Sequence, residues 1–481
     1  MLFTEPTFLF LFLPLLLALY FLRRPQASYA NWILLIASVI FYAKGGGLFT
    51  WLILWSIVFN YWIAILVQRF KATSLRLSKT FLSVAVGVNL LVLGVFKYAN
   101  FFGDNVNAVL AGFDKPPIAF PVILLPIGIS FFTFHAISYV VDVYRGDATA
   151  QKSPVHAALY LLLFPQLIAG PIIRYRTIAN QLARRVVSLD DFAEGVRRFV
   201  TGLGKKVLIA NVVAVPADRI FSAPIAALDA PHAWLAVICY TLQIYFDFSG
   251  YSDMAIGLGR MFGFHFPENF RWPYISGTVQ EFWRRWHMTL SAWFRDYLYV
   301  PLGGNRVSAP RTYRNLVTVF FLCGLWHGAS WNFVIWGLFH GTFLVIERLG
   351  LASVVKRLWL PLRHVYLMLV VMIGWVFFRA ETLPIAMAFL RTMFGLQTAT
   401  ELTPFTLAWH LTPEVWLALL LGIVGSTPII PALSAWRTTS LTRWRAIGFD
   451  AAATASLMVI FGAAILQMAA RTYNPFIYFR F

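Results

Sequence analysis

The stretch FLCGLWHGASWNFVIWGLFHG, residues 321–341, is among the most apolar parts of the chain, yet it contains two histidines, a serine and an asparagine. Such polar groups are costly to bury unless they are hydrogen-bonded. A straight helix over residues 317–346 would be about 45 Å long, whereas the hydrocarbon core of a bilayer is roughly 30 Å thick. We therefore predict that this segment is tilted or broken, with the break at His327, which three small residues follow.

The composition of the whole chain is typical of a polytopic membrane protein. Of its 481 residues, 59% are hydrophobic and only 12% are charged, which is about half the charged fraction of an ordinary soluble domain. Apolar runs long enough to cross a bilayer recur along the entire length. We expect one all-α integral-membrane domain over residues 1–481, with about 10–12 transmembrane helices plus re-entrant segments and no internal repeat.

Basic residues in the loops predict the orientation. The first expected spans cover residues 8–22, 31–43, 48–67, 80–98 and 120–143. Between them, one side holds Arg23, Arg24, Arg69, Lys71, Arg76, Lys79, Arg145 and Lys152, and the other holds Lys44, Lys97 and Lys115. Because cytoplasmic loops carry the excess of Lys and Arg, we expect the N-terminus outside. The same bias explains the formal charge of +19 without a nucleic-acid partner.

The segment over residues 156–171 is too short and too rich in proline for a simple crossing, and four arginines follow it. A crossing would place those arginines outside. We therefore expect a re-entrant segment on the cytoplasmic side, where irregular backbone at membrane depth lines a cavity.

Carboxylates interrupt a later apolar run, YFDFSGYSDMAIGLG, residues 245–259. Asp247 and Asp253 are expensive at membrane depth and are expected to face a bundle interior or a water-filled cavity. The structural interpretation is a polar break that caps two half-helices, and the functional one is a place beside a tunnel.

The two histidines of the opening stretch cannot share a site on a straight helix. Thirteen residues separate them, which corresponds to about 140° around the axis and about 20 Å along it. We expect His340 to pair with Glu347 as a buried structural histidine. Cys323, four residues before His327, is expected to be a small apolar filler, with a Cys-His acyl relay as the alternative.

A second histidine lies in EFWRRWHMTLSAWFRDYLYVPLGGNR, residues 281–306. On one straight helix, a polar stripe within about an 80° arc would be formed by Arg284, His287, Ser291 and Arg295. The stripe fits an interfacial helix with snorkelling arginines, or a reaction centre. Imidazole can accept a proton from a hydroxyl near neutral pH, and a second imidazole can orient the reactants or stabilise an oxyanion. The motifs HExxH and CxxC are absent, and the chain has only two cysteines, so we expect no metal site.

Several stretches together resemble the membrane-bound O-acyltransferase family, in the bacterial branch that acetylates alginate and, more distantly, adds D-alanine to teichoic acids. The resemblance covers most of the chain and weakens after Ala380. Its motifs are LFLFLP (10–15), VFKYANFF (95–102), LLPIGISFFTFHAISYVVDVYRGD (124–147), FPQLIAGPIIRY (164–175), residues 245–259 and 281–306 quoted above, GLWHGASWNFVIWGLFHG (324–341) and the aromatic tail NPFIYFRF (474–481).

The resemblance implies a fold in which a tunnel crosses the membrane and two catalytic histidines meet at its middle. These correspond to His327 in the WHG motif and His287 in the RWH motif, with a catalytic core over residues 120–346 and more variable helices over 380–481. His327 is expected to act as general base, and His287 to orient or stabilise. Further candidates for contacts to the donor or the tunnel are Arg284, Arg295, Ser291, Trp326, Asn332, Asp247 and Asp253.

The expected activity is transfer of an acetyl group across the bacterial inner membrane, toward an exported polysaccharide such as an alginate-like polymer, cellulose or peptidoglycan. The donor is a cytoplasmic thioester, acetyl-CoA or an acylated carrier, and no bound cofactor is expected. Because no extracytoplasmic domain is evident, we expect a periplasmic acetyltransferase partner of the SGNH type. The alternatives are D-alanyl transfer to teichoic-acid-type polymers and a proton-coupled transporter or flippase, whose repeat symmetry is not evident.

Overall fold

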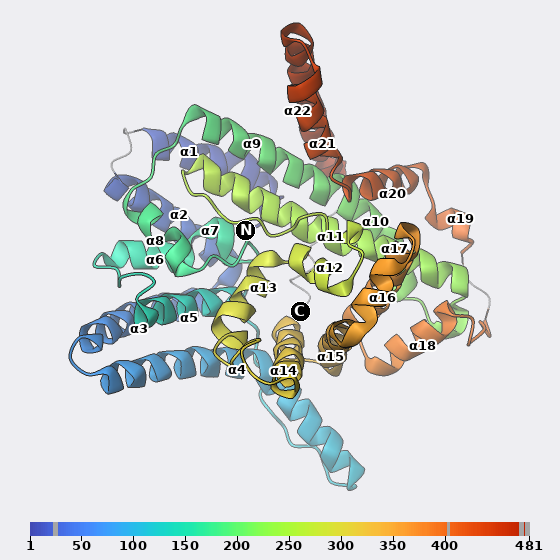
Figure 1. The fold of residues 1–481 in the computed structure, drawn as a ribbon, viewed down its shortest axis with the longest axis horizontal. Coiled ribbons are helices and arrows are strands. Elements are labelled where there is room, and N and C mark those ends of the chain that lie inside the picture. Colours follow the sequence, from blue (N-terminus) through green and yellow to red (C-terminus); the bar gives the residue numbers. More distant parts are fainter. Residues whose placement is uncertain (23–26, 402–404, 471–475, 477–481) are drawn as a thin grey trace. The chain divides into compact units, whose positions relative to one another are not determined.

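The fold was described from a computed structural model, in which residues 1–22, 27–401, 405–470 and 476 are placed. These residues form helices and connecting loops, with no strand among them (Figure 1). The chain divides into two compact units. The first contains Met1–Val196 and Ala255–Pro267, and the second contains Arg197–Met254 and Glu268–Phe481. The predicted core, residues 120–346, therefore has residues in both units, and most of the aromatic tail lies outside the described residues.

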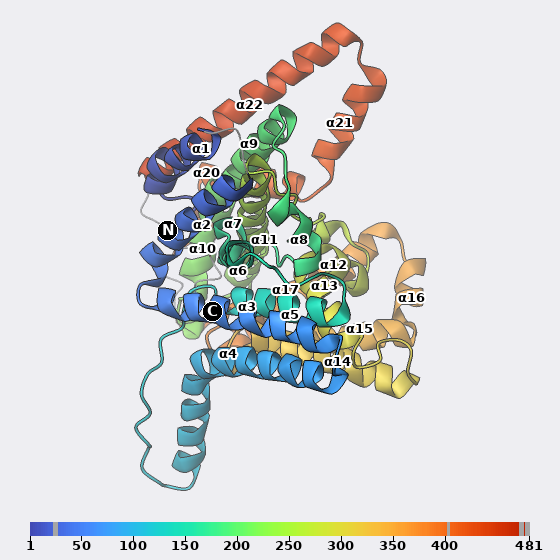
Figure 2. The same cartoon turned by 90° about the vertical axis from the view of Figure 1, so that its left-hand side faces the viewer.

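The first unit consists of the N-terminal helices. They are η1 (Phe8–Phe12), α1 (Leu13–Phe21), α2 (Ala27–Gly46), α3 (Phe49–Lys71), α4 (Leu75–Gly112), α5 (Ile129–Arg145), α6 (Pro154–Leu162), α7 (Phe164–Leu167), α8 (Tyr175–Ala183) and the first part of α9 (Leu189–Gly204). Helices α3, α4 and α5 pack side by side (Figure 2).

Two predictions for this unit can be compared with the structure. The span expected over residues 120–143 begins only at Ile129, because Pro121 and Pro126 lie in non-helical chain and Gly128 has a left-handed φ of 75°. The segment over residues 156–171 is short and broken, as predicted, since α6 and α7 are separate short helices with largely buried side chains. The side of the membrane to which it returns stays a prediction.

The second unit contains the end of α9, most of α11, and all later helices. Its elements are η2 (Lys205–Ala210), α10 (Asn211–Phe221), η3 (Ile225–Ala227), α11 (Ala230–Met261), η4 (Pro273–Ile275), α12 (Val279–Arg285), α13 (Met288–Phe294), η5 (Arg295–Tyr299), α14 (Ala309–His327), α15 (Trp331–Ile346), η6 (Glu347–Leu351), α16 (Ala352–Arg357), α17 (Leu360–Arg379), α18 (Leu383–Met393), α19 (Leu407–His410), α20 (Pro413–Gly425), α21 (Ile429–Ser440) and α22 (Arg443–Ala470). Helices α21 and α22 form a hairpin (Figure 2).

Helix α11 passes through residues 245–259 without interruption, so the predicted polar break is wrong. The helix stays continuous at these carboxylates because lysines from η2 neutralise their charge. Asp247 forms a buried ion pair with Lys206, and Asp253 lies 2.6 Å from the Lys205 ammonium. Helices α9 and α11 can approach closely because each has a glycine where they cross. A Cβ on Gly250 of α11 would lie 2.8 Å from the carbonyl oxygen of Gly202 of α9.

Six helices within the described residues are long and apolar enough to cross a membrane, or seven if the bent pair α20 and α21 forms one span. The six are Phe49–Lys71, Leu75–Gly112, Leu189–Phe221, Trp331–Arg357, Leu360–Arg379 and Arg443–Ala470. The other expected crossings correspond to helices that are shorter, broken or more polar, such as Phe8–Phe21 and Leu383–Met393. The protein is a polytopic all-α membrane protein.

Candidate functional site

The stretch over residues 321–341 forms a helical hairpin whose tip carries His327. Helix α14 ends at His327 and α15 begins at Trp331, so the predicted break at His327 is confirmed. The two helices approach backbone to backbone, since a Cβ on Gly337 would lie 3.1 Å from the Cα of Gly324. Packing requires glycine at position 328, because a Cβ there would overlap the ring of Phe333.

His327 lies in an aromatic cage at the C-terminal end of α14. Its side chain is 5% exposed, and its ring centroid lies 4.9 Å from those of Trp326 and Trp336 and 5.3 Å from that of Phe378. A ring N–H or lone pair of His327 at this position could therefore serve an oxyanion or a hydroxyl proton.

His287 does not lie on a continuous helix. Helix α12 ends at Arg285 and α13 begins at Met288, with His287 between them in the left-handed region at φ 42° and ψ 54°. The polar stripe predicted from one straight helix is therefore wrong, because the left-handed residue changes the direction of the chain. His287 is 1% exposed, whereas Arg284 and Arg295 are exposed.

Asn269 holds His287 in place. The Asn269 Oδ1 lies 3.0 Å from the His287 Nδ1, and the Met288 N–H donates to the Asn269 carbonyl oxygen at 2.8 Å. The ring of Phe248, on α11, lies edge-on at 4.6 Å. These contacts retain a left-handed non-glycine backbone that costs of order 1–3 kcal/mol.

The structure brings His287 and His327 to the same indole, although they are far apart in the sequence. The ring centroid of Trp326 lies 6.2 Å from that of His287 and 4.9 Å from that of His327. Trp326, a predicted tunnel residue, thus contacts both predicted catalytic histidines.

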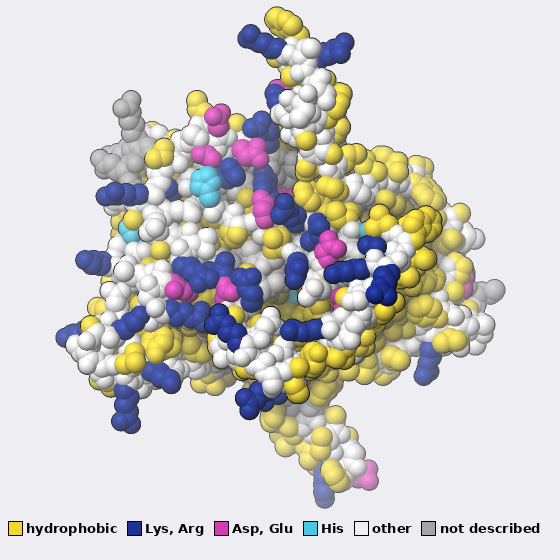
Figure 3. Space-filling model, viewed as in Figure 1, with side chains coloured by type: hydrophobic (Ala, Val, Ile, Leu, Met, Phe, Trp, Pro, Cys, Tyr) yellow, Lys and Arg dark blue, Asp and Glu magenta, His cyan; other side chains and the backbone are white. Residues whose placement is uncertain are grey.

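Two cavities are lined by sequence neighbours of these histidines, Met288 in one and Cys323 in the other, although His287, Trp326 and His327 line neither. The basic cavity, of about 870 Å³, is lined by Arg271, Arg284, Arg285, Lys356 and Arg363, by Glu281, and by several uncharged residues. Lys and Arg side chains gather on this face over α12 and α16 (Figure 3). The apolar cavity, of about 220 Å³, is lined by Trp283, Leu290, Phe294, Leu316, Val319, Phe320, Cys323 and Leu344, and by Gln280, Arg284, Ser291, Arg295 and Tyr299. Gln280 and Arg284 line both cavities.

The apolar cavity extends along α14 toward His327. Cys323 lines it and lies four residues, about one helical turn, before His327. Arg284, Ser291 and Arg295, which were predicted to share a face with His287, therefore share a cavity without it. The Arg295 Nε also donates to the carboxylate of Asp296 at 2.8 Å.

The remaining predicted site residues have packing partners elsewhere. The side-chain amide of Asn332 donates to the Ala380 carbonyl oxygen at 2.6 Å and so joins α15 to the end of α17. Asp247 and Asp253 are engaged in the ion pairs described above, and neither lines the basic or the apolar cavity.

The predicted pairing of His340 with Glu347 is wrong. The Glu347 carboxylate accepts hydrogen bonds from the N–H groups of Val279 and Gln280, at 2.7 and 2.9 Å, at the beginning of α12. Neither ring nitrogen of His340 has a hydrogen-bond partner among the residues that the structure describes. His340 is instead packed against Trp283, with ring centroids 5.1 Å apart.

Sequence reasoning missed Asn269. The only local signal is an isolated amide in PENF, residues 267–270, within an aromatic-rich stretch. Its contact with His287 depends on loop geometry that periodicity does not describe.

The membrane-bound O-acyltransferase family model matches residues 129–381, more than half of the chain. The chain is 45% identical over the full length of both proteins to a probable alginate O-acetylase of Azotobacter vinelandii. It is 36% identical to a peptidoglycan O-acetyltransferase of Helicobacter pylori over 82% of this chain and 80% of that protein. A teichoic acid D-alanyltransferase of Bacillus subtilis is 29% identical over 49% of this chain and 62% of its own length. The chain therefore belongs to the membrane-bound O-acyltransferase family.

Proposed function

We propose that this O-acyltransferase transfers an acetyl group from a cytoplasmic thioester toward an exported polysaccharide. The observation that carries the proposal is the contact of His287 and His327 with one indole, together with a cavity whose lining residue Cys323 lies about one helical turn before His327 on α14. The names of the full-length relatives support O-acetylation of alginate or a similar polymer. The N-terminus would lie outside the inner membrane, and a periplasmic acetyltransferase of the SGNH type would complete the transfer.

The two cavities suit the two parts of a thioester donor. Phosphates bind arginine through charge-assisted and often bidentate hydrogen bonds, which the cations of the basic cavity could supply. The narrow arm that carries the acyl group is less polar and fits the smaller, apolar cavity. Arg284 lines both and would meet the donor where its charged and uncharged parts join.

The reaction needs one proton acceptor and one group that stabilises negative charge. The acceptor hydroxyl attacks the thioester carbonyl carbon as its proton passes to one imidazole. The second imidazole donates an N–H to the carbonyl oxygen while that oxygen is negatively charged. The C–S bond then breaks, and the proton passes to the departing thiolate. A positioned acid or base contributes typically 10²–10⁴-fold.

Radiolabelled acetyl-CoA supplied to inverted inner-membrane vesicles tests the proposal, with label followed into the polymer fraction. We expect His327→Ala to abolish incorporation and His340→Ala to retain it, because His340 lines neither cavity. Equal loss in both variants would contradict the proposed centre. Incorporation from a D-alanyl carrier but not from an acetyl donor would replace acetylation by D-alanyl transfer.

A further inference from the structure

We propose that Asn269 is a positioning residue that fixes the tautomer of His287 and makes the Nε2 atom of His287 the acceptor of the hydroxyl proton. The inference rests on the proposed function, because it assigns the roles of the two imidazoles. It differs from the sequence-based expectation, in which His327 is the base and His287 orients the reactants.

The hydrogen bonds around Asn269 define which of its two side-chain groups faces His287. The Thr289 N–H lies 3.4 Å from the Asn269 Oδ1, and the Thr289 hydroxyl lies 2.9 Å from the same atom. A backbone N–H can only donate, so the atom that faces it must be the amide oxygen. The amide nitrogen points the other way and donates to the Ser252 hydroxyl at 2.9 Å.

The orientation of the amide then sets the tautomer of His287. The Asn269 Oδ1 can only accept a hydrogen bond, so the His287 Nδ1, 3.0 Å away, must carry the proton. In a neutral imidazole the other nitrogen then has the lone pair. The His287 Nε2 is buried and has no hydrogen-bond partner among the described residues. The neutral side chain therefore offers an acceptor at Nε2 and cannot donate there to an oxyanion.

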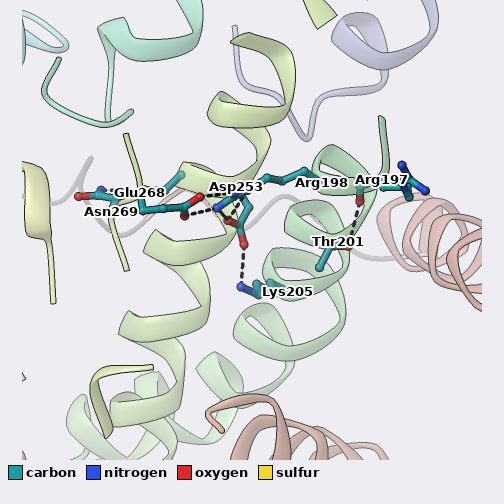
Figure 4. Close-up of polar contacts among 8 residues, drawn as sticks. Arg197, Arg198, Thr201, Lys205, Asp253, Glu268 and Asn269 are labelled. Atoms are coloured by element: carbon teal, nitrogen blue, oxygen red, sulfur yellow. Dashed lines mark hydrogen bonds and ion pairs between the residues drawn. The ribbon is translucent and has the colours of Figure 1, made fainter. Parts of the chain in front are cut away.

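Asn269 is itself held by its neighbours in the sequence. Glu268 forms an ion pair with Arg198, which also contacts Asp253 at 2.9 Å (Figure 4). Asp253 follows Ser252, whose hydroxyl accepts a hydrogen bond from the side-chain amide of Asn269. Two consecutive loop residues, Glu268 and Asn269, are thus tied to groups on α9 and α11. This arrangement fixes the amide before any substrate arrives, as expected for a preorganised site.

The resulting division of roles uses both histidines. His287 Nε2 takes the proton as the hydroxyl O–H bond breaks and the new O–C bond forms. His327, at the end of α14, is placed to donate a ring N–H to the carbonyl oxygen. As the C–S bond breaks, the proton held by His287 passes to the sulfur, so the products are an ester and a thiol.

The test compares Asn269→Leu with Asn269→Asp in inverted vesicles supplied with radiolabelled acetyl-CoA. Leucine has a similar size but cannot accept a hydrogen bond, so kcat should fall by about the same factor as in His287→Ala, within 10²–10⁴-fold. KM for acetyl-CoA should not change, because Asn269 lines neither cavity. Aspartate keeps the acceptor oxygen and should retain kcat within about tenfold. In the His287→Ala background, Asn269→Leu should cause no further loss, because coupled residues are not additive.

Further variants separate positioning from folding. Ser252→Ala removes the partner of the amide nitrogen but leaves both Thr289 donors to the amide oxygen, so kcat should fall less than in Asn269→Leu. If Asn269→Leu does not reach the membrane, Thr289→Val tests the same link, since it removes the hydroxyl donor that orients the amide and should lower kcat about tenfold at unchanged KM. Wild-type kcat in Asn269→Leu or Thr289→Val, beside an inactive His287→Ala, would overturn the inference. Full activity of His287→Ala would instead refute the proposed role of His287.

Discussion

Breaking the buried ion pair between Asp247 and Lys206 by removing one partner is predicted to destabilise the second unit strongly. The two side chains are 2% and 5% exposed. Asp247→Leu would leave the ammonium buried without its carboxylate. Removing one partner of a buried pair costs about 3–5 kcal/mol, which is roughly two to three and a half orders of magnitude in the folding equilibrium.

The loss of stability in Asp247→Leu should come from the unpaired charge of Lys206 and not from the loss of the aspartate side chain itself. Adding Lys206→Met to Asp247→Leu removes the uncompensated charge, and replacement of a buried pair by apolar residues of similar size is often neutral or stabilising. The double variant should therefore regain most of the lost stability. An exposed pair, Arg437 and Asp450 on the α21–α22 hairpin, is the matched control, and Asp450→Asn should cause no measurable change.

Unfolding by sodium dodecyl sulfate, titrated into detergent-solubilised protein and followed by tryptophan fluorescence, measures these differences. A double variant that is as unstable as Asp247→Leu alone would refute the reasoning, because it would show that the carboxylate stabilises the fold through something other than its neutralisation of Lys206. Wild-type stability of Asp247→Leu would refute the assigned magnitude.

Three further predictions concern the cavities and the hairpin. Arg284→Gln should raise KM for acetyl-CoA about 10- to 100-fold, since a charge-assisted hydrogen bond contributes about 1.5–3 kcal/mol, and steady-state kinetics with unchanged KM would contradict a donor contact. Cys323→Ala should retain acyl transfer, whereas Cys323→Phe should fill the apolar cavity and abolish acyl transfer while the protein stays folded. Loss of activity in Cys323→Ala would support the Cys-His relay instead. Gly337→Ala should lower stability by about 1–3 kcal/mol through overpacking at the α14–α15 crossing, and an unshifted unfolding midpoint would show that the helices can separate.

Predictions from local sequence were most accurate where chain length and residue size decide the structure. The break at His327 follows from an apolar run that is too long for one straight span and from the small residues after the histidine. The short, interrupted segment over residues 156–171 follows from its prolines in the same way. Both features depend on neighbours in the sequence, so no knowledge of tertiary contacts was needed.

Predictions that required a tertiary partner were less successful. The break expected in α11 did not occur because cations from η2 neutralise Asp247 and Asp253, and helical periodicity carries no information about such partners. Glu347 was expected to bind His340 on its own helix, but it accepts the backbone N–H groups that begin α12.

The position of His287 also depends on tertiary contacts. A helical wheel placed its side chain beside Arg284 and Ser291, but the left-handed backbone at His287, held by Asn269, removes it from that face. The meeting of His287 and His327 was expected only from the family resemblance. The residue that orients His287 lies in a loop, where neither periodicity nor motif spacing applies.

The left-handed backbone at His287 also implies a compromise between activity and the stability of the fold. Glycine adopts this conformation without steric cost, whereas histidine does not. A substitution to glycine would remove the imidazole and relax the chain at the same position. Under the mechanism proposed above, selection for a stable fold and selection for catalysis therefore oppose each other at this residue, because the proposed reaction uses a side chain that the strained backbone carries.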